Sequence, residues 1–324
     1  MNYFGIDIGG TAIKYGIVDE AGHVLISEEY PDNFDGYKTP ILTTLLATSK
    51  QFLENNKIDT MTLAGIGVSA TGQIDCEAGV VAGVGGNIIN WEGAAIKDSL
   101  IEKYHLPVTV VNDANCVALA EAWIGGAKGC HDVIVVTIGT GVGGGIIVND
   151  RILLGHRGFG GELGHIVIAK DGVPCTCGNT GCYERYASMT ALVKNVRAVL
   201  PIDGLLGYTA DKVNGRTIFE QVAAGQPVIS KIVDQWIADI ATGLVSLTHI
   251  FNPEIILLGG GVSAQEELFI SKVRTQVKKR VMGNFGKELR VEGAALKNSA
   301  GLIGAVHYLI QSMNASQSVD VRSR

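Results

Sequence analysis

The apolar residues of this chain fall into short runs and into longer stretches with helical spacing. Short apolar runs rich in β-branched residues predict buried strands at 3–6, 15–18, 23–26, 63–68, 108–111, 133–138, 146–149 and 254–258. Apolar residues spaced three to four positions apart predict helices at 38–55, 113–123, 218–224, 227–250, 263–281 and 300–310. This mixture of elements predicts an α/β protein.

A strand, a glycine-rich bend and a second strand occur twice in the chain. With an offset of 130 residues, four positions of the first copy fall on matching positions of the second: Gly9 on Gly139, Ile17 on Ile147, Val18 on Val148 and Asp19 on Asn149. The strands, bends and polar turns keep the same lengths in both copies. We therefore predict an internal duplication that gives two related lobes.

The duplication suggests where the lobes begin and end. The predicted small lobe covers 1–112, with a helix at about 300–311 packing back on it. The predicted large lobe covers 113–299 and contains a loop at 165–184 that is rich in cysteine and glycine. The polar residues 312–324 predict a frayed, disordered tail.

The two glycine bends are candidates for phosphate binding, because a strand–bend–strand with glycines exposes backbone N–H groups. The residues concerned are Asp7, Gly9, Gly10, Thr11 and Lys14 in the first copy and Gly139, Thr140 and Gly141 in the second. Asp7 could bind Mg²⁺, usually through water. Each bend could equally be an ordinary hairpin turn.

Three glycines after a strand, Gly259, Gly260 and Gly261, allow a flat ligand such as adenine with its ribose to approach the backbone, although they too could form a simple turn. The second bend also matches the G-x-G-x-x-G pattern of dinucleotide-binding folds, but that pattern should open a helix, and β-branched residues follow here. The P-loop pattern G-x-x-x-x-G-K-[ST] does not occur in the sequence. The bends therefore favour a nucleoside triphosphate over NAD.

The loop at 165–184 has the composition of a zinc site. Its candidate ligands are His165, Cys175, Cys177 and Cys182. Three thiolates and one imidazole fill the tetrahedral shell that Zn²⁺ prefers, so a metal held here would be structural and would have no place for a reactive water. Such a metal would fix Glu162 and Glu184 at the two ends of the loop. The alternative is a set of reduced cysteines in a glycine-rich loop.

Two further positions could carry chemistry. Asp113 lies where a predicted strand ends and a predicted helix begins, so it is either a helix N-cap or a general base, and spacing alone does not separate the two. Asn87 could bond sugar hydroxyls or satisfy its own turn. The strand at 63–68 ends at Ser69–Gly72, and strand ends of α/β sheets commonly contact ligands.

Composition narrows the class of protein. The chain of 324 residues is 47% apolar and 18% charged, so it can bury a sizeable core. The net charge of −6 argues against a broad nucleic-acid surface. No apolar stretch approaches 18 residues and the N-terminus lacks a signal-peptide pattern, so we expect no membrane segment and a cytoplasmic location.

The motifs occur together in an order that resembles the repressor/open-reading-frame/kinase (ROK) family of bacterial sugar kinases and regulators. They are Asp7-x-Gly9-Gly10-Thr11-x-x-Lys14, Asn112-Asp113-Ala114-Asn115, Gly139-Thr140-Gly141-x-Gly143, Gly161-Glu162-Leu163-Gly164-His165, Cys175-x-Cys177-Gly178-x-x-Gly181-Cys182-x-Glu184, and Asn252-Pro253-Glu254 through Gly261. The resemblance covers roughly residues 3–310, and the cysteine motif after Gly-Glu-Leu-Gly-His is its most specific part.

The resemblance implies an actin-like (ribonuclease H-like) duplicated fold of two lobes, with ATP and a sugar in the cleft between them. It implies that Asp113 is the general base, that both bends and Gly259–Gly261 hold ATP, and that the His/Cys set binds zinc. Sugar hydroxyls would be contacted by Asn87, Asn112, Glu162, His165 and Glu184. The sequence departs from the common pattern at Gly86 and at Thr71–Gly72, which border the implied sugar pocket.

We therefore expect an ATP-dependent hexose kinase that uses Mg²⁺, carries structural Zn²⁺ and phosphorylates the 6-hydroxyl of glucose. The alternative substrates are N-acetylmannosamine, N-acetylglucosamine, fructose and a β-glucoside. A sugar-responsive repressor of the same family is the alternative from another class, but such members carry a helix-turn-helix domain before the first bend, and here that bend begins at Asp7. A homodimer is expected from the resemblance alone.

Overall fold

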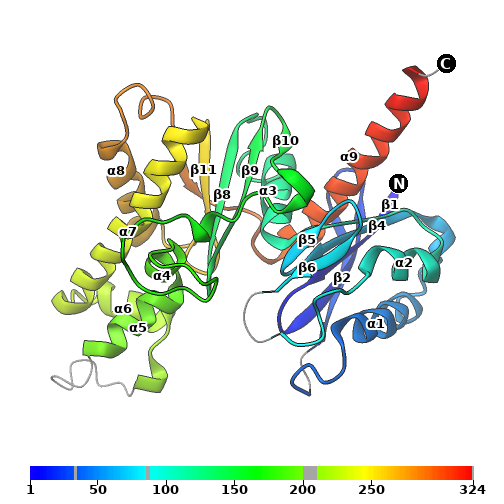
Figure 1. The fold of residues 1–324 in the computed structure, drawn as a ribbon, viewed down its shortest axis with the longest axis horizontal. Helices are drawn as coiled ribbons and strands as arrows, with labels where there is room; N and C mark the ends of the chain where they lie inside the picture. The colour runs from blue at the N-terminus through cyan, green and yellow to red at the C-terminus, as the bar shows by residue number, and fades with distance from the viewer. Residues whose placement is uncertain (33–34, 85–87, 200–209, 323–324) are drawn as a thin grey trace. The chain divides into compact units, whose positions relative to one another are not determined.

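The protein consists of two compact units (Figure 1). The computed structural model describes residues 1–32, 35–84, 88–199 and 210–322. The first unit comprises Met1–Gly129, Ile152–Gly161 and Leu296–Arg324, and the second comprises Cys130–Arg151 and Glu162–Ala295. The first unit thus extends past residue 112, where the sequence analysis ended the small lobe, because helix α3 (Asp113–Trp123) packs on helix α9 (Ala300–Arg322).

The first unit is built on a five-stranded sheet with the order β3-β2-β1-β4-β7. Its strands are β1 (Asn2–Ile8), β2 (Ala12–Asp19), β3 (Val24–Pro31), β4 (Leu63–Ala70) and β7 (Val108–Asn112). Strand β1 is antiparallel to β2 and parallel to β4. The remaining elements are helices α1 (Ile41–Asn55) and α2 (Ile96–Tyr104), the hairpin β5 (Gln73–Asp75) and β6 (Val80–Gly83), and the short turns η1 (Thr60–Thr62), η2 (His156–Gly158) and η7 (Lys297–Ser299).

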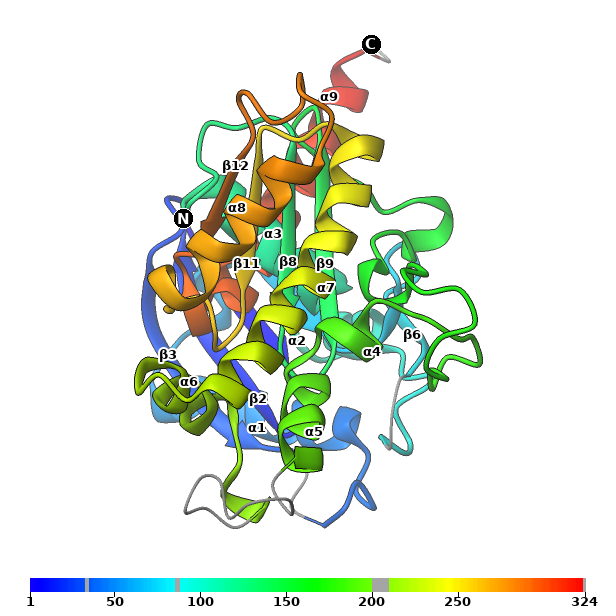
Figure 2. The same ribbon diagram turned by 90° about the vertical axis from the view of Figure 1, so that its left-hand side faces the viewer.

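The second unit repeats this sheet with the order β10-β9-β8-β11-β12. Its strands are β8 (Val133–Ile138), β9 (Val142–Val148), β10 (Arg151–Ile152), β11 (Ile255–Gly259) and β12 (Arg290–Gly293). Its helices are α4 (Glu184–Ala187), α5 (Met189–Val199), α6 (Gly215–Ala223), α7 (Pro227–Phe251) and α8 (Ser271–Arg280), with short helical turns η3 (Leu163–His165), η5 (Ala210–Lys212) and η6 (Glu266–Ile270). Figure 2 shows α7 and α8 over one face of this sheet. In both sheets the strands take the same order, so the predicted duplication and α/β class are confirmed.

The two glycine bends differ in length, which corrects one detail of the predicted repeat. In the first hairpin Ile8 pairs with Ile13, which leaves four residues, 9–12, in the bend. In the second, Ile138 pairs with Val142, which leaves three, 139–141. The reason is local: the Gly9 N–H bonds the carbonyl of Ala12 at 3.0 Å, whereas the Gly139 N–H bonds that of Gly141 at 3.0 Å.

Helix α9 lies against the first sheet because small residues let the two backbones approach. A Cβ at Gly67 of β4 would overlap the carbonyl of Ala305, and one at Gly304 would overlap that of Cys116 in α3. Leu302, Val306 and Leu309 are buried in the same region. Helix α9 was predicted to end at 310 but continues to Arg322.

The long helix α7 begins and ends as its sequence indicates. Gln226 is the N-cap, its side chain accepts from the Val228 N–H at 2.8 Å, and Pro227 occupies the first turn, where its missing N–H costs nothing. Asn252 ends the helix with a left-handed φ of 47°, and Pro253 follows. Its buried face includes Trp236, Ile240 and Leu244, which belong to the core of the second unit.

Candidate functional site

The first hairpin places an acidic and a basic residue opposite each other on neighbouring strands. Asp7 of β1 pairs with Lys14 of β2. The Ser69 hydroxyl donates to Asp7 Oδ1 at 2.6 Å, and Lys14 Nζ donates to the carbonyl of Asn298 at 2.8 Å. Burial raises the pKa of Asp7, while the Ser69 bond and the charge of Lys14 act in the opposite direction.

Hydrogen bonds from outside the hairpin hold its bend. The Tyr37 hydroxyl donates to the carbonyl of Gly10. Thr11 is exposed, and its carbonyl accepts from the Asp32 N–H at 3.2 Å. The bend therefore presents Gly9, Gly10 and Thr11 at the end of the β1–β2 pair, as the sequence predicted.

Asp113 is the first residue of α3, and the helix is capped by its neighbour. Asn112 is the N-cap, and its Oδ1 accepts from the N–H groups of Ala114 at 2.9 Å and Asn115 at 3.3 Å. The N-cap position therefore belongs to Asn112 and not to Asp113. The half-buried Asp113 carboxylate accepts from the Ala114 N–H at 2.8 Å, and an anion is favoured at this end of a helix.

Asn112 also ties the helix start to a neighbouring turn. Its Nδ2 donates to the carbonyl of Gly72 at 2.9 Å, and Trp91 Nε1 donates to that of Thr71 at 2.9 Å. Gly72 has a φ of 101°, which side chains rarely adopt. Asn112 thus positions both Asp113 and Gly72. Asn87 lies outside the described residues, so its predicted contact stays a prediction.

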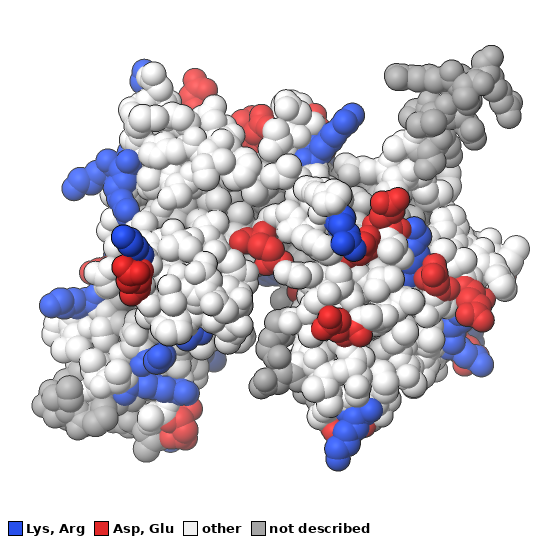
Figure 3. Space-filling model, in the orientation of Figure 1, with Lys and Arg blue, Asp and Glu red and all other residues white. Residues whose placement is uncertain are grey.

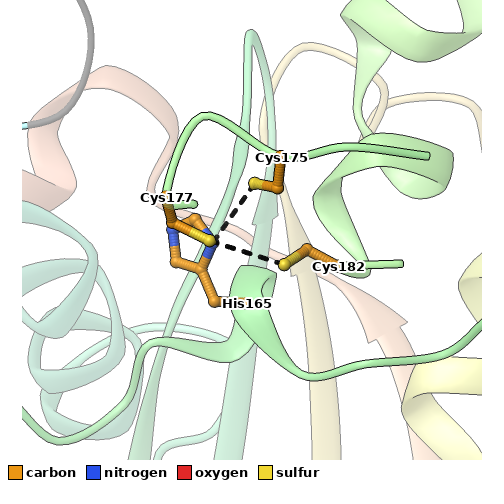
Figure 4. Close-up of side chains that lie close together, drawn as sticks. All are labelled: His165, Cys175, Cys177 and Cys182. Carbon is orange, nitrogen blue, oxygen red and sulfur yellow. Dashed lines mark hydrogen bonds between the residues drawn. The ribbon is translucent and has the colours of Figure 1, made fainter. Parts of the chain in front are cut away.

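The four predicted zinc ligands come together in the second unit (Figure 4). The ligand atoms of His165, Cys175, Cys177 and Cys182 all lie within 4.8 Å of one another. Sγ of Cys175 is 3.8 Å from Nδ1 of His165, and the Sγ atoms of Cys177 and Cys182 are 3.6 Å apart. Bonds of 2.0–2.3 Å to a tetrahedral Zn²⁺ would place ligand atoms roughly 3.5–3.8 Å apart. The arrangement therefore fits a zinc ion.

The backbone of the loop is folded around this cluster. The Cys175 N–H bonds the carbonyl of Asn179 at 2.8 Å, and Gly178 takes a φ of 91° in the turn between the cysteines. Tyr183, next to a ligand, donates its hydroxyl to the carbonyl of Ile240 in α7 at 2.8 Å. Burial raises the pKa of the Cys182 thiol to about 12, so a metal that binds it must displace a proton.

The two glutamates at the ends of the loop differ in environment. Glu162 is exposed and immediately precedes η3, which carries His165. Glu184 is half-buried at the start of α4. Its Oε2 accepts from the Val142 N–H at 3.2 Å, and its Oε1 lies 3.9 Å from Sγ of Cys175. Glu184 therefore contacts both the metal cluster and the second hairpin.

The second hairpin opens onto a pocket in the same unit. The Met189 N–H donates to the carbonyl of Gly139 at 2.9 Å, and the Thr190 hydroxyl donates to that of Thr140 at 2.7 Å. Gly259 ends β11 beside Thr137 of β8. A pocket of about 1210 Å³ is lined by Gly139, Thr140 and Gly261 together with side chains of α5, α6 and η6. Two of the three segments predicted to hold ATP thus share one pocket.

The other wall of this pocket was not predicted from the sequence. It is formed by residues that include Met189, Thr190, Lys194, Arg197, Arg216, Phe219 and Gln265. The signal available was the pattern of α5, where buried Leu192 and Val196 alternate with exposed Lys194 and Arg197. That pattern predicts an amphipathic helix but not what its polar face contacts.

On the face drawn in Figure 3, acidic and basic side chains are scattered among uncharged ones.

Comparison with known proteins places the chain in a family. The model of the ROK family matches residues 3–312. The chain belongs to the ROK family. The glucokinase of Halalkalibacterium halodurans is 33% identical over 97% of each chain. The β-glucoside kinase of Listeria innocua is 32% identical over 97% of this chain and 99% of its own.

A solved structure extends this similarity to the fold. The ROK family glucokinase from Streptomyces griseus in complex with glucose and AMPPNP is 32% identical, covers 94% of this chain and 98% of its own, and has a TM-score of 0.80. The predicted actin-like fold is confirmed, and the kinase relatives of this ROK member support sugar kinase activity. Among the described residues, no helix has the length and apolarity that a membrane span requires.

Proposed function

We propose that this ROK family member is an ATP-dependent hexose kinase that phosphorylates the 6-hydroxyl of glucose. The observation that carries the proposal is its similarity, over 94% of the chain, to a glucokinase that holds glucose and AMPPNP. The nucleotide-type pocket between the second hairpin and Gly261 agrees with it.

Asp113 is the proposed general base. It would accept the proton of the sugar hydroxyl as the oxygen attacks the γ-phosphate. Its place in the first turn of α3 favours the ionised carboxylate, because the helix N-terminus stabilises negative charge. Asn112 takes the capping role, so Asp113 can serve the reaction without loss of the cap.

The backbone of both hairpins would hold the phosphates of ATP. Phosphoryl transfer depends mainly on positioning and on electrostatic stabilisation, and the N–H groups of Gly10–Thr11 and Thr140–Gly141 would supply both. Lys14 adds a positive charge, and Gly259–Gly261 leave room for the base and ribose. Mg²⁺, when bound, would neutralise phosphoryl oxygens, and Asp7 is the side chain we propose to hold it through water.

The sugar would be bound by Gly72, Asn87, Asn112, Glu162, His165 and Glu184. Glucose is preferred because Glu162, His165 and Glu184 form a set that bonds hydroxyls. The β-glucoside kinase among the relatives keeps that substrate as an alternative, beside N-acetylmannosamine, N-acetylglucosamine and fructose. A coupled ADP-release assay over this panel identifies the sugar with the highest kcat/KM.

Zinc is proposed as a structural ion. His165, Cys175, Cys177 and Cys182 would fill its shell, and the chemistry it supplies is the cross-linking of the loop rather than activation of water. Glu184 would then be held by the loop. Metal analysis of freshly purified protein tests this, with one zinc per chain as the expected result.

The test of the base is Asp113→Asn. We expect kcat to fall about 10²–10⁴-fold, the usual contribution of general-base catalysis, while glucose binding measured by calorimetry is retained. The matched control is Asp98→Asn, which removes an aspartate from the first turn of α2 in the same unit and should leave kcat unchanged. Near-wild-type turnover of the Asp113 variant would exclude it as the base.

A further inference from the structure

The cysteine-rich loop at 165–184, called the metal loop below, contacts the second hairpin around Val142. The Val142 N–H donates to Glu184 Oε2 at 3.2 Å. A Cβ at Gly164 would overlap the Val142 carbonyl, and it would lie 3.4 Å from Cβ of Glu184. Gly164 immediately precedes the metal ligand His165, and Glu184 follows the ligand Cys182 by two residues. Both polar groups of the Val142 backbone therefore face a segment that carries a metal ligand.

Gly141, the residue before Val142, also lies against Glu184. A Cβ at Gly141 would overlap Oε2 of Glu184 and lie 3.5 Å from its Cδ. The φ of Gly141 is not in the left-handed range, so its conformation does not require glycine. A side chain at position 141 would therefore displace the Glu184 carboxylate from its present place.

The two ligand-bearing segments are also joined to each other. The Tyr183 N–H donates to the carbonyl of Ile166 at 2.8 Å, and Val167 forms a β-bridge with Cys182. A metal bound to His165 and the three cysteines closes this connection with strong bonds. It thereby fixes the distance between Gly164 and Glu184, on which the position of Val142 depends.

We propose that the metal loop positions the phosphate-binding bend of the second hairpin through Glu184, so that metal binding and nucleotide binding strengthen each other. Glu184 is a positioning residue in this role, additional to its proposed contact with the sugar. The inference rests on the proposed function, in which residues 139–141 bind ATP. Coupling between two binding sites is reciprocal, so each ligand raises the affinity of the other by the same factor.

The first experiment measures the affinity of AMPPNP, without sugar, by calorimetry on zinc-loaded and chelated protein. We expect the chelated protein to bind about fivefold or more weakly, within the usual range of coupling between sites. Zinc affinity, measured by competition with a chelator, should rise by the same factor when AMPPNP is present. Equal AMPPNP affinity in the two forms would overturn the proposal.

Variants test the contact without removing the metal. Gly141→Ala and Glu184→Ala should weaken AMPPNP binding about fivefold or more while keeping one zinc per chain, and Glu184→Gln, which keeps an acceptor for the Val142 N–H, should recover most of the loss. The control Lys170→Ala changes an exposed charged residue of the same loop that has no proposed role in binding, and should leave AMPPNP affinity unchanged. Wild-type affinity in Gly141→Ala and Glu184→Ala would contradict the proposed role of Glu184.

Hydrogen exchange separates this inference from the proposed function. Without nucleotide, chelation should speed amide exchange across 139–145 and leave the bend at 9–12 unchanged. If AMPPNP does not bind the loaded protein but exchange at 139–145 still responds to metal, the proposed function fails and the positioning by the loop stands. If AMPPNP binds and exchange at 139–145 is the same in both forms, the positioning fails and the proposed function stands.

Discussion

The two hairpins share a topology but present different chemistry. In the first, Asp7 and Lys14 face each other across the strands, and a four-residue bend follows. In the second, the corresponding pair is Thr137 and Gly143, and the bend has three residues. The first hairpin therefore offers charged side chains as well as backbone, whereas the second offers backbone N–H groups almost alone.

The two hairpins are also held in place by different parts of the structure. The first hairpin is held by elements of its own core: Ser69 of β4 bonds Asp7, and the carbonyl of Asn298 before α9 bonds Lys14. The second is held by α5 through Thr190 and by the metal loop through Glu184. The first hairpin therefore carries ionic groups, and the second is supported by the metal loop of its own unit.

The largest expected effect comes from the charged pair. Asp7→Asn should lower kcat by about 10²-fold or more if Asp7 holds Mg²⁺ as proposed, because the variant loses that carboxylate. Burial raises the pKa of Asp7, so the neutral amide should not destabilise the fold. The matched change Thr137→Val should alter kcat less than about threefold. Steady-state kinetics of both variants checks the comparison, and equal losses would remove the proposed division of roles.

The next prediction compares two glycines that follow strands, Gly260 after β11 and Gly72 after β4. Gly260 has a φ of 94°, and a Cβ there would overlap the Ile138 carbonyl. Gly72 has a φ of 101°, and its Cβ would lie 2.8 Å from the Gly83 carbonyl. Gly260→Ala should lower the free energy of unfolding by about 3 kcal/mol and Gly72→Ala by about 1–2 kcal/mol. Urea denaturation measures both, and the reverse order would contradict the geometry.

Much of this architecture follows from local patterns in the sequence. The strands of both hairpins are short apolar runs whose bends are marked by glycine, and α7 ends at Asn252–Pro253 because one residue tolerates a left-handed φ and the next cannot continue a helix. The metal ligands could also be predicted from the sequence, because their spacing places four suitable side chains in one short loop.

Other features depend on tertiary contacts that no local pattern contains. Asn112 and Asp113 are both good N-caps, and only the structure shows that Asn112 takes the N-cap position and accepts from two N–H groups, while Asp113 accepts from the Ala114 N–H. The bends differ by one residue because of different N–H partners, which similar glycine content conceals. Thr190 reaches Thr140 across 50 residues, so the support of the second bend could not be inferred from either segment alone.

Buried ionisable groups of the first unit predict that its stability depends on pH. His307 of α9 stacks on Trp123 with ring centroids 4.5 Å apart, its Nδ1 has no partner among the described residues, and burial lowers its pKa to about 4. The unfolded chain, with a histidine pKa near 6.5, therefore binds the proton more readily. Stability is full above about pH 6.5 and falls as the pH drops towards 4, by about 2 kcal/mol at pH 5.

His307→Phe checks this, because it keeps a flat ring against Trp123 and cannot titrate. Its unfolding free energy should change less between pH 7 and pH 5 than that of the wild type. The difference between the two proteins isolates His307 from other titrating groups such as Asp32, whose pKa burial raises to about 6 and whose effect has the opposite sign. Parallel pH curves would show that His307 does not contribute.

The smallest expected effect on stability comes from removing either of two similar ion pairs. Lys50 and Glu54 in α1 and Arg216 and Glu220 in α6 are exposed pairs four residues apart, with N–O distances of 3.6 and 3.1 Å. Lys50→Ala and Arg216→Ala should each change the free energy of unfolding by less than about 0.5 kcal/mol, since exposed pairs contribute little. Of the two substituted residues, Arg216 lines the pocket beside the second bend and Lys50 does not, so only the loss of Arg216 should raise the KM for ATP. An unchanged KM in Arg216→Ala would mean that Arg216 does not contact the nucleotide, and that the nucleotide is held instead by the other residues around the second bend.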